Sequence, residues 1–334
     1  MTIRERQERD EEARLSPYAA LSSRSAGRAH PISTCDLRTC YQRDRDRIIH
    51  CKSFRRLKYK TQVFLTPMGD HYRTRLTHTL EVSQVARTLA RSLRLNEDLT
   101  EAAALGHDLG HTPFGHIGES TLNRLLPDGF RHNEQSLRVA ERLENDGAGL
   151  NLCRETLDGI LNHSGQNEPK TLEGWCVRRA DRIAYINHDI DDAIRGGILK
   201  PFELPRRCLS VLGETHGERI DTMIRDIVTT SLDQPFVKMS EEVRQASEEL
   251  RAFLFEYVYH DEWRKKEEAR CDYILSALYE HYLAHPEQLP AEYLEINFTE
   301  GAERAVCDFI ACMTDRYAID QFSEIFVPGA FGRR

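Results

Sequence analysis

The sequence predicts an all-α protein, and two observations support this class. Apolar residues recur at helical spacing in many segments, as in HTLEVSQVARTLARSL, where His78, Val82, Val85 and Leu89 share one face. A series of alternating β segments joined by hairpin turns, which would indicate a sheet, is not found. With 334 residues and 40% hydrophobic composition, the chain is long enough to bury a substantial core.

Composition and charge exclude several classes of protein. The formal net charge of −8 argues against a nucleic-acid coat or a membrane-surface role, because neutralising phosphates requires an excess of Lys and Arg. The nine cysteines form no CxxC pair, so we expect reduced thiols in a cytoplasmic protein. No apolar leader and no run of about 18 apolar residues is found, so we expect no membrane partner.

The chain divides into three regions. Residues 1–34 are polar and end in SSRSAGRAHPIST, which predicts an N-terminal arm leading into a first helix near Asp36. Residues 35–200 contain the helical core, and prolines and glycines near residue 200 mark a break. Helical patterns continue through residues 201–334, so we expect a C-terminal helical subregion packed on the same core.

A basic run from Arg43 to Lys60 comes first in the predicted core. Its ordinary interpretation is a solvated helix face that pairs with Asp44 and Asp46. Clustered Arg and Lys beside a metal ion would also neutralise a triphosphate, which carries about four negative charges. The pattern alone leaves both interpretations open.

The stretch ALGHDLGHTPFGHIGE places three histidines and two acids within residues 104–119. Helical spacing upstream and Pro113 downstream predict a helix that delivers His107 and Asp108 at its buried C-terminal end. Adjacent helix positions point about 100° apart, so both side chains meet only at a target close to the helix. A metal ion about 2 Å from each donor meets that condition.

Two further donors lie on other predicted helices. His78 is on the apolar stripe described above, and Asp181 is in VRRADRIAYINHDIDDAIR. That segment has an apolar stripe of isoleucines and a second, polar stripe formed by Asp181, Tyr185, His188, Asp189 and Asp192. Two imidazoles and two carboxylates suit Mn²⁺, Fe²⁺, Co²⁺, Ni²⁺ or Zn²⁺, with water completing the coordination. Taken singly, a histidine on an apolar face is more often a hydrogen-bonded core residue.

The ordered donors resemble the H…HD…D signature of HD-domain metal-dependent phosphohydrolases. Longer stretches resemble the deoxyguanosine triphosphate triphosphohydrolase (dGTPase) family: RDRDRIIHCKSFRRLKYKTQVF, RTRLTHTLEVSQVARTLAR, ALGHDLGHTPFGHIGE, RHNEQSLR, NHSG, TLEGWCVRRADRIAYINHDIDDAIRGG and MTDRYA. The resemblance covers most of residues 15–327. It implies an HD-domain helical core with additional C-terminal helices.

The same resemblance implies an activity and partners. These enzymes hydrolyse a deoxynucleoside triphosphate, here with dGTP favoured, to a deoxynucleoside and intact tripolyphosphate. One divalent ion per site is implied, with Mg²⁺ added to the ions above, and a second Mg²⁺ would accompany the triphosphate. A homo-oligomer, often a hexamer, and an effector that is a nucleotide or single-stranded DNA are the implied partners.

The resemblance also assigns roles residue by residue. The metal ligands are His78, His107, Asp108 and Asp181. The catalytic group comprises His116, Glu119 and His132, with His111 lining the same pocket. The substrate contacts are Arg55, Arg56, Lys60, Gln62, Arg75, Arg182, Tyr185 and Asp189.

Chemistry supports these roles independently. Releasing tripolyphosphate requires departure of a poorly acidic 5′-oxygen, so a protonated imidazole such as that of His116 would help, and Glu119 at i+3 can hold its tautomer. A Tyr185 ring beneath the sugar would crowd a 2′-hydroxyl. Two other functions stay open: an HD hydrolase acting on a nucleoside monophosphate or an alarmone, and a non-catalytic regulator that binds nucleotide or single-stranded nucleic acid.

Overall fold

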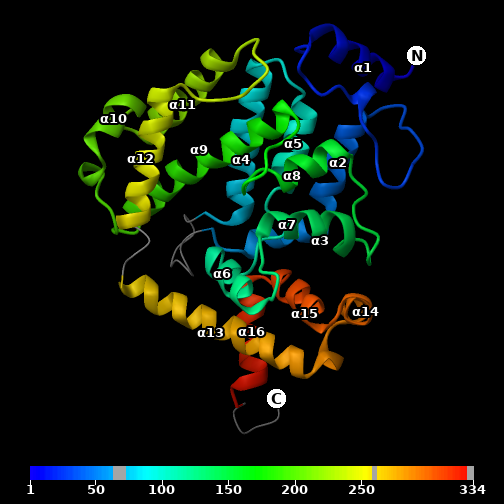
Figure 1. The fold of residues 1–334 in the computed structure, drawn as a ribbon, viewed down its shortest axis with the longest axis vertical. Helices are drawn as coiled ribbons and strands as arrows, with labels where there is room; N and C mark the ends of the chain where they lie inside the picture. Colours follow the sequence, from blue (N-terminus) through cyan, green and yellow to red (C-terminus); the bar gives the residue numbers. More distant parts are fainter. Residues whose placement is uncertain (63–72, 258–261, 329–334) are drawn as a thin grey trace.

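The computed structural model describes residues 1–62, 73–257 and 262–328, and within these ranges it contains sixteen α-helices and no β-sheet (Figure 1). The predicted all-α class is therefore confirmed. The helices are α1 (Ile3–Arg14), α2 (Cys40–His50), α3 (Lys52–Arg56), α4 (Arg75–Ser92), α5 (Glu97–Gly106), α6 (His116–Leu125), α7 (His132–Arg138), α8 (Arg154–Leu161), α9 (Leu172–Arg195), α10 (Arg206–Leu212), α11 (His216–Ser231), α12 (Glu241–Tyr257), α13 (Glu262–Ala284), α14 (Ala291–Glu300), α15 (Ala302–Ala311) and α16 (Asp315–Phe326).

The expectation that the first helix begins near Asp36 is wrong, because α1 already forms at Ile3–Arg14, within the N-terminal arm. A capping box starts it: the Thr2 hydroxyl accepts from the Glu5 amide at 3.2 Å, and the Glu5 carboxylate accepts from the Thr2 amide at 2.7 Å. The helix buries none of its side chains. It consists mainly of Arg, Glu and Gln, which favour helix without apolar periodicity, so a search for stripes missed it.

The centre of the fold is the contact between α4 and α9. The predicted stripe is confirmed: Val82, Val85 and Leu89 of α4 are buried against Ile183 and Ile190 of α9 in one apolar cluster. Helices α10, α11 and α12 add their apolar faces to the same cluster. This packing fixes the two long helices that carry His78 and Asp181.

A second apolar cluster joins α6 to the last helices. Leu122 of α6 packs with Leu275 and Leu278 of α13 and with Ile310 of α15. Figure 1 shows α13 to α16, in orange and red, gathered at the end of the molecule away from α1. The region after residue 200 thus divides between two clusters, and the boundaries at residues 34 and 200 stay predictions.

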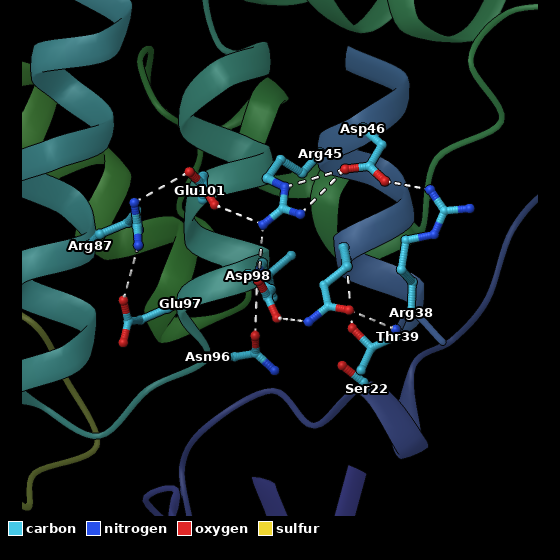
Figure 2. A network of polar contacts seen from close by, with 12 residues as sticks. Ser22, Arg38, Thr39, Arg45, Asp46, Arg87, Asn96, Glu97, Asp98 and Glu101 are labelled. Atoms are coloured by element: carbon cyan, nitrogen blue, oxygen red, sulfur yellow. Dashed lines mark hydrogen bonds and ion pairs between the residues drawn. The ribbon is translucent and has the colours of Figure 1, made fainter. Parts of the chain in front are cut away.

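Ion pairs connect α2, α4 and α5 on a solvated face (Figure 2). Arg45 of α2 lies 3.5 Å from Asp98 and 3.3 Å from Glu101 of α5, and Arg87 of α4 lies 3.4 Å from Glu101. Such partly exposed pairs contribute at most about 1 kcal/mol each. Their role is to set how α2 lies against the two helices that present the histidines.

Two further properties bear on the sequence predictions. All nine cysteines lie in the described ranges, and each is a free thiol. In the part of the chain that the structure describes, no helix combines the length and apolar character needed to cross a bilayer.

Candidate active site

A cavity of about 1070 Å³ brings together most of the residues singled out above. It opens beside α4, the end of α5, the start of α6, α9 and α12. Its lining includes His78, Asp108 and Asp181 of the donor set, the histidines His111, His116 and His132, and Gln62, Arg75, Arg182 and Tyr185. Segments more than 100 residues apart in sequence therefore meet at one concave site.

The four metal-ligand candidates converge from three helices. Donor atoms of His78, His107 and Asp108 lie within 4.8 Å of one another. Oδ1 of Asp181 lies 3.1 Å from Nε2 of His78 and 3.8 Å from Nε2 of His107. The fold thus delivers two imidazoles and two carboxylates to one point, as the order of these residues in the sequence predicts.

The chemistry of these donors fits a divalent ion. His107 Nδ1 donates to the Ala104 carbonyl oxygen at 2.7 Å, which leaves the lone pair on Nε2. That Nε2 is buried and has no hydrogen-bond partner among the described residues. A buried imidazole nitrogen aimed at two carboxylates, with its tautomer fixed by a backbone carbonyl, is the arrangement that a metal ligand requires.

Both carboxylates are held in the ionised form. Burial would raise the pKa of Asp108, but His107 and the Arg75 guanidinium bring it well below its ordinary value. Burial would likewise raise the pKa of Asp181, and the hydrogen bond with His78 and the nearby His107 ring lower it instead. Arg75 is 2% exposed, and its Nη1 donates to Asp108 Oδ2 at 2.7 Å. Oδ1 of Asp108 is the oxygen nearer His107.

A chain of side chains runs from the cavity mouth to the buried wall. His116, half-exposed at the first position of α6, places Nδ1 3.6 Å from Oε2 of Glu119. Oε1 of Glu119 accepts from both the amide and Nδ1 of His132 at 2.9 Å. Nε2 of His132 lies 3.1 Å from Nε2 of His163, whose Nδ1 donates to the Ile160 carbonyl oxygen at 2.7 Å.

These partners dictate where the protons lie. Burial and the neighbouring His107 and His132 rings lower the pKa of His163 to about 3, so its Nε2 is an acceptor. His132 then donates from both ring nitrogens, to His163 and to Glu119. Burial would lower the pKa of His132, but Glu119 raises it above its ordinary value. Burial would raise the pKa of Glu119, and the bonds with His116 and His132 bring it far below its ordinary value.

His111 completes the histidine cluster. Its ring is stacked on that of His132, with centroids 4.5 Å apart, and lies edge-on to His116 at 5.6 Å. Burial and the charge of Arg75 lower its pKa well below the ordinary value, so it is neutral. Its buried Nδ1 has no hydrogen-bond partner in the described part of the chain.

Four predicted substrate residues are not brought to the cavity lining. Arg55 is exposed and its Nη1 donates to the His50 carbonyl oxygen at 2.8 Å. Arg56 is partly buried near Tyr293 and Cys312. Lys60 is 2% exposed, and its Nζ donates to the carbonyl oxygens of His111 and Ala311. Asp189 is buried one turn after Tyr185 in α9.

Other lining residues escaped the sequence reasoning. His163 lies in the NHSG stretch, which resembled the family but was assigned no role. Arg179, Lys238 and Arg251 also line the cavity, beside Arg182, which the resemblance had already assigned to substrate. Among the described residues, none of these four cations has an acidic partner within ion-pair distance. Burial and the charges of Arg182 and Arg178 lower the pKa of Arg179 to about 10. The same lining contains Glu241 and Glu248, which both pair with Arg244, so cations outnumber acids on this electropositive wall.

Comparison with known proteins identifies two matching regions. Residues 75–186 match the HD domain, and residues 237–324 match the phosphohydrolase-associated domain. A deoxyguanosinetriphosphate triphosphohydrolase-like protein of Caldanaerobacter subterraneus subsp. tengcongensis is 58% identical, over 98% of this chain and 97% of that protein. Proteins of the same description from Clostridium perfringens and Desulfatibacillum aliphaticivorans are 51% and 49% identical, each over 98% of this chain and at least 98% of their own length.

The comparison with solved structures gives a weak match. It is that of a hypothetical protein from Aquifex aeolicus, at 21% identity over 85% of this chain and 71% of that chain. Its TM-score is 0.35, which is too low to support an argument about this fold.

Proposed function

Because the chain belongs to the family of deoxyguanosinetriphosphate triphosphohydrolase-like proteins and carries their HD domain, we propose that it hydrolyses deoxynucleoside triphosphates to deoxynucleoside and tripolyphosphate. Membership makes the protein an HD phosphohydrolase, and the substrate and products are our proposal. The observation that carries it is one cavity lined by His78, Asp108 and Asp181, with His107 directly behind them, and by His116 and His132, which Glu119 links.

The donor set would hold one divalent ion. Such an ion, when bound, supplies Lewis-acid polarisation of a phosphoryl oxygen and lowers the pKa of bound water. Arg75 holds the Asp108 carboxylate through its Nη1 bond, and the Ala104 carbonyl holds the His107 ring. The protein's own contribution is therefore to fix the orientation of two donors before substrate arrives.

The triphosphate would lie along the electropositive wall. Arg179, Arg182, Lys238 and Arg251 offer positive charge without acidic partners among the described residues. Phosphate oxygens form charge-assisted hydrogen bonds with such guanidinium groups. The cavity therefore supplies partners for a highly charged chain of phosphates, which a nucleoside monophosphate would not need.

His116 is the group that we assign to the leaving 5′-oxygen. Its Nδ1 faces Glu119 at 3.6 Å, so the doubly protonated ring would donate the proton of Nε2 to the leaving oxygen and keep the proton of Nδ1 toward Glu119. Glu119 is kept ionised by its contacts with His116 and His132, and the carboxylate in turn favours one tautomer of His116. Neutral His111 presents its Nδ1, which has no hydrogen-bond partner among the described residues, near the same point.

Tyr185 supports discrimination by sugar. Its ring lines the cavity, and its centroid lies 6.3 Å from that of His116, edge to face. If His116 contacts the 5′-oxygen, the deoxyribose attached to that oxygen would lie beside the Tyr185 ring. A 2′-hydroxyl there would be crowded against the aromatic ring.

The direct test is product analysis. We would incubate the metal-loaded protein separately with each of the four dNTPs and with GTP, and resolve the phosphates by anion exchange. Tripolyphosphate from a dNTP but not from GTP is the expected result. Orthophosphate or pyrophosphate instead would favour another nucleotide as substrate. The homo-oligomer and the effector, a nucleotide or single-stranded DNA, stay predictions. Repeating the assay with each effector added tests for activation.

A further inference from the structure

Asp315 connects the C-terminal helices to two separate segments of the active-site cavity. It is the first residue of α16, lies within MTDRYA, and is 8% exposed. Its Oδ2 accepts from the Thr61 amide at 2.9 Å and from the Thr61 hydroxyl, and its Oδ1 accepts from the Phe114 amide at 2.9 Å. Within the described residues no cationic group lies at ion-pair distance, so these three bonds satisfy the carboxylate.

The Thr61 bonds fix the segment that carries Gln62. Thr61 also forms an isolated bridge with Thr74, and the Arg75 amide donates to the Lys60 carbonyl oxygen at 3.0 Å. The side chain of Lys60 reaches the carbonyl oxygens of His111 and Ala311. Residues 60–62 are thereby held between the cavity and the end of α15, and Gln62 lines the cavity.

The Phe114 bond fixes the turn that leads into α6. Phe114 and Gly115 both have φ of 60°, and His116 follows as the first helical residue. A phenylalanine in the left-handed region is disfavoured and persists only where its surroundings hold it. Here its amide bonds to Asp315 and its ring is buried, 4% exposed, against the C-terminal helices.

The two segments also touch each other. A Cβ added at Gly115 would lie 3.1 Å from the Gln62 carbonyl oxygen and 3.3 Å from Nη2 of Arg75. The turn before His116 therefore packs directly against the segment that ends in Gln62. A shift in either segment is transmitted to the other.

We propose that Asp315 is a positioning residue that sets Gln62 and His116 in register with each other. The proposal rests on the roles assigned above to those two residues. The two Thr61 donors and the Phe114 amide bond to different oxygens of Asp315. A side chain of this length supplies two acceptor oxygens only when it ends in a carboxylate. An asparagine whose oxygen faces the two Thr61 donors presents its own N–H₂ to the Phe114 amide, so Asp315→Asn breaks the Phe114 connection.

The test separates positioning from folding by comparing Asp315→Asn with two other variants. Thr61→Val keeps the backbone donor and the side-chain shape but removes the hydroxyl bond. Asp320→Asn is the matched control, because Asp320 is an exposed acid on the same helix. Each variant is examined by dNTP hydrolysis, by Mn²⁺ titration and by hydrogen–deuterium exchange resolved on peptides spanning residues 58–62 and 109–117.

We expect Asp315→Asn to lower kcat by about tenfold to a hundredfold, since small misplacements of a catalytic group have effects of that size. Mn²⁺ affinity stays unchanged, because α4, α5 and α9 hold the donors, and exchange accelerates in peptide 109–117. Thr61→Val raises KM more than it lowers kcat, and accelerates exchange in peptide 58–62. Asp320→Asn leaves every readout at the wild-type value.

Two results would overturn the proposal. One is wild-type kcat in Asp315→Asn, and the other is faster exchange throughout the chain with weakened Mn²⁺ binding, which would indicate a general structural role. If the wild-type protein hydrolyses no dNTP, the proposed function fails. The exchange pattern in the two peptides then decides the coupling of the segments by itself.

Discussion

A carboxylate buried between α7 and α15 allows a quantitative test of how the C-terminal helices support the site. Asp308 has no exposed surface. It accepts from Arg138 Nε at 3.0 and 2.8 Å, from Gln135 Nε2 at 2.8 Å and from Arg304 Nε at 3.2 Å. Gln135 and Arg138 are on α7, which begins with His132, so Asp308 anchors the helix that carries a proposed catalytic histidine.

The expected loss for Asp308→Asn follows from these contacts. Removing one charge from a buried ion pair typically costs about 3–5 kcal/mol, because the partner is left uncompensated. The side chains of Arg138 and Arg304 are 17% and 29% exposed, and Arg138 also lies 2.8 Å from Glu300. Water and Glu300 therefore compensate part of the positive charge, and we expect the lower end, a loss of about 3 kcal/mol in the free energy of unfolding.

Urea denaturation measures this loss as a lower midpoint at an unchanged slope. Asp221→Asn is the matched control, because Asp221 pairs with Arg225 at 2.6 Å on the surface of α11, with both side chains more than half exposed. That variant should change the free energy of unfolding by less than about 0.5 kcal/mol. A loss below about 1 kcal/mol in Asp308→Asn would refute the interpretation of Asp308 as an essential anchor.

Three further outcomes are expected. His107→Ala should weaken Mn²⁺ binding by about a hundredfold or more in a titration, and unchanged affinity would remove His107 from the ligand set. Asp108→Ala is a less clean test, because it also leaves the buried Arg75 guanidinium without its carboxylate partner. His116→Ala should leave Mn²⁺ bound and lower kcat by about 10²–10⁴, whereas an unaltered kcat would exclude it as the acid. Burial raises the pKa of Glu173 from 4.5 to about 7, so its contribution to stability is complete below pH 4.5 and is lost as the pH rises through 7. Relative to Glu173→Gln, which cannot ionise, wild-type stability should decline by about 2–3 kcal/mol across that range in denaturation at a series of pH values, and parallel curves would contradict the assignment.

The sequence predicted those parts of the fold that depend on apolar periodicity. The stripes of α4 and α9 specify which faces are buried, and the helices pack on those faces. Helix α1 has no such stripe, so only its caps and propensity reveal it, and both are weak signals in a polar segment. The division of the described residues after 200 between two clusters was not predictable. The apolar stripes in this region show which helix face is buried, but not which other helices that face packs against.

In the candidate site, the sequence predicted the positions of residues on long helices but not of residues in short or non-helical segments. His78 and Asp181 lie on long helices, where phase fixes direction, and the structure brings both to the cavity. Arg55 and Lys60 lie in and after the five-residue α3, where direction depends on what packs nearby. For Lys60 that neighbour is the end of α15, some 250 residues later. No local sequence pattern could therefore show that its ammonium group donates to two backbone carbonyl oxygens. His163 lies after α8 in a non-helical stretch, which gives no phase at all.

The proposed metal donors and the proposed catalytic histidines are held in place by different parts of the chain. The metal donors come from α4, α5 and α9, which the central cluster holds together. The histidines that would handle protons come from the starts of α6 and α7, and carboxylates from beyond residue 300 bond to both segments: Asp315 accepts from the turn before His116, and Asp308 accepts from Gln135 and Arg138 in the body of α7. Residues 75–186 match the HD domain, and residues 237–324 match a separate associated domain that contains both carboxylates. The region that matches the HD domain thus gathers the proposed metal ligands and carries the proposed catalytic histidines, and the region that matches the associated domain supplies two carboxylates that bond to the segments bearing those histidines.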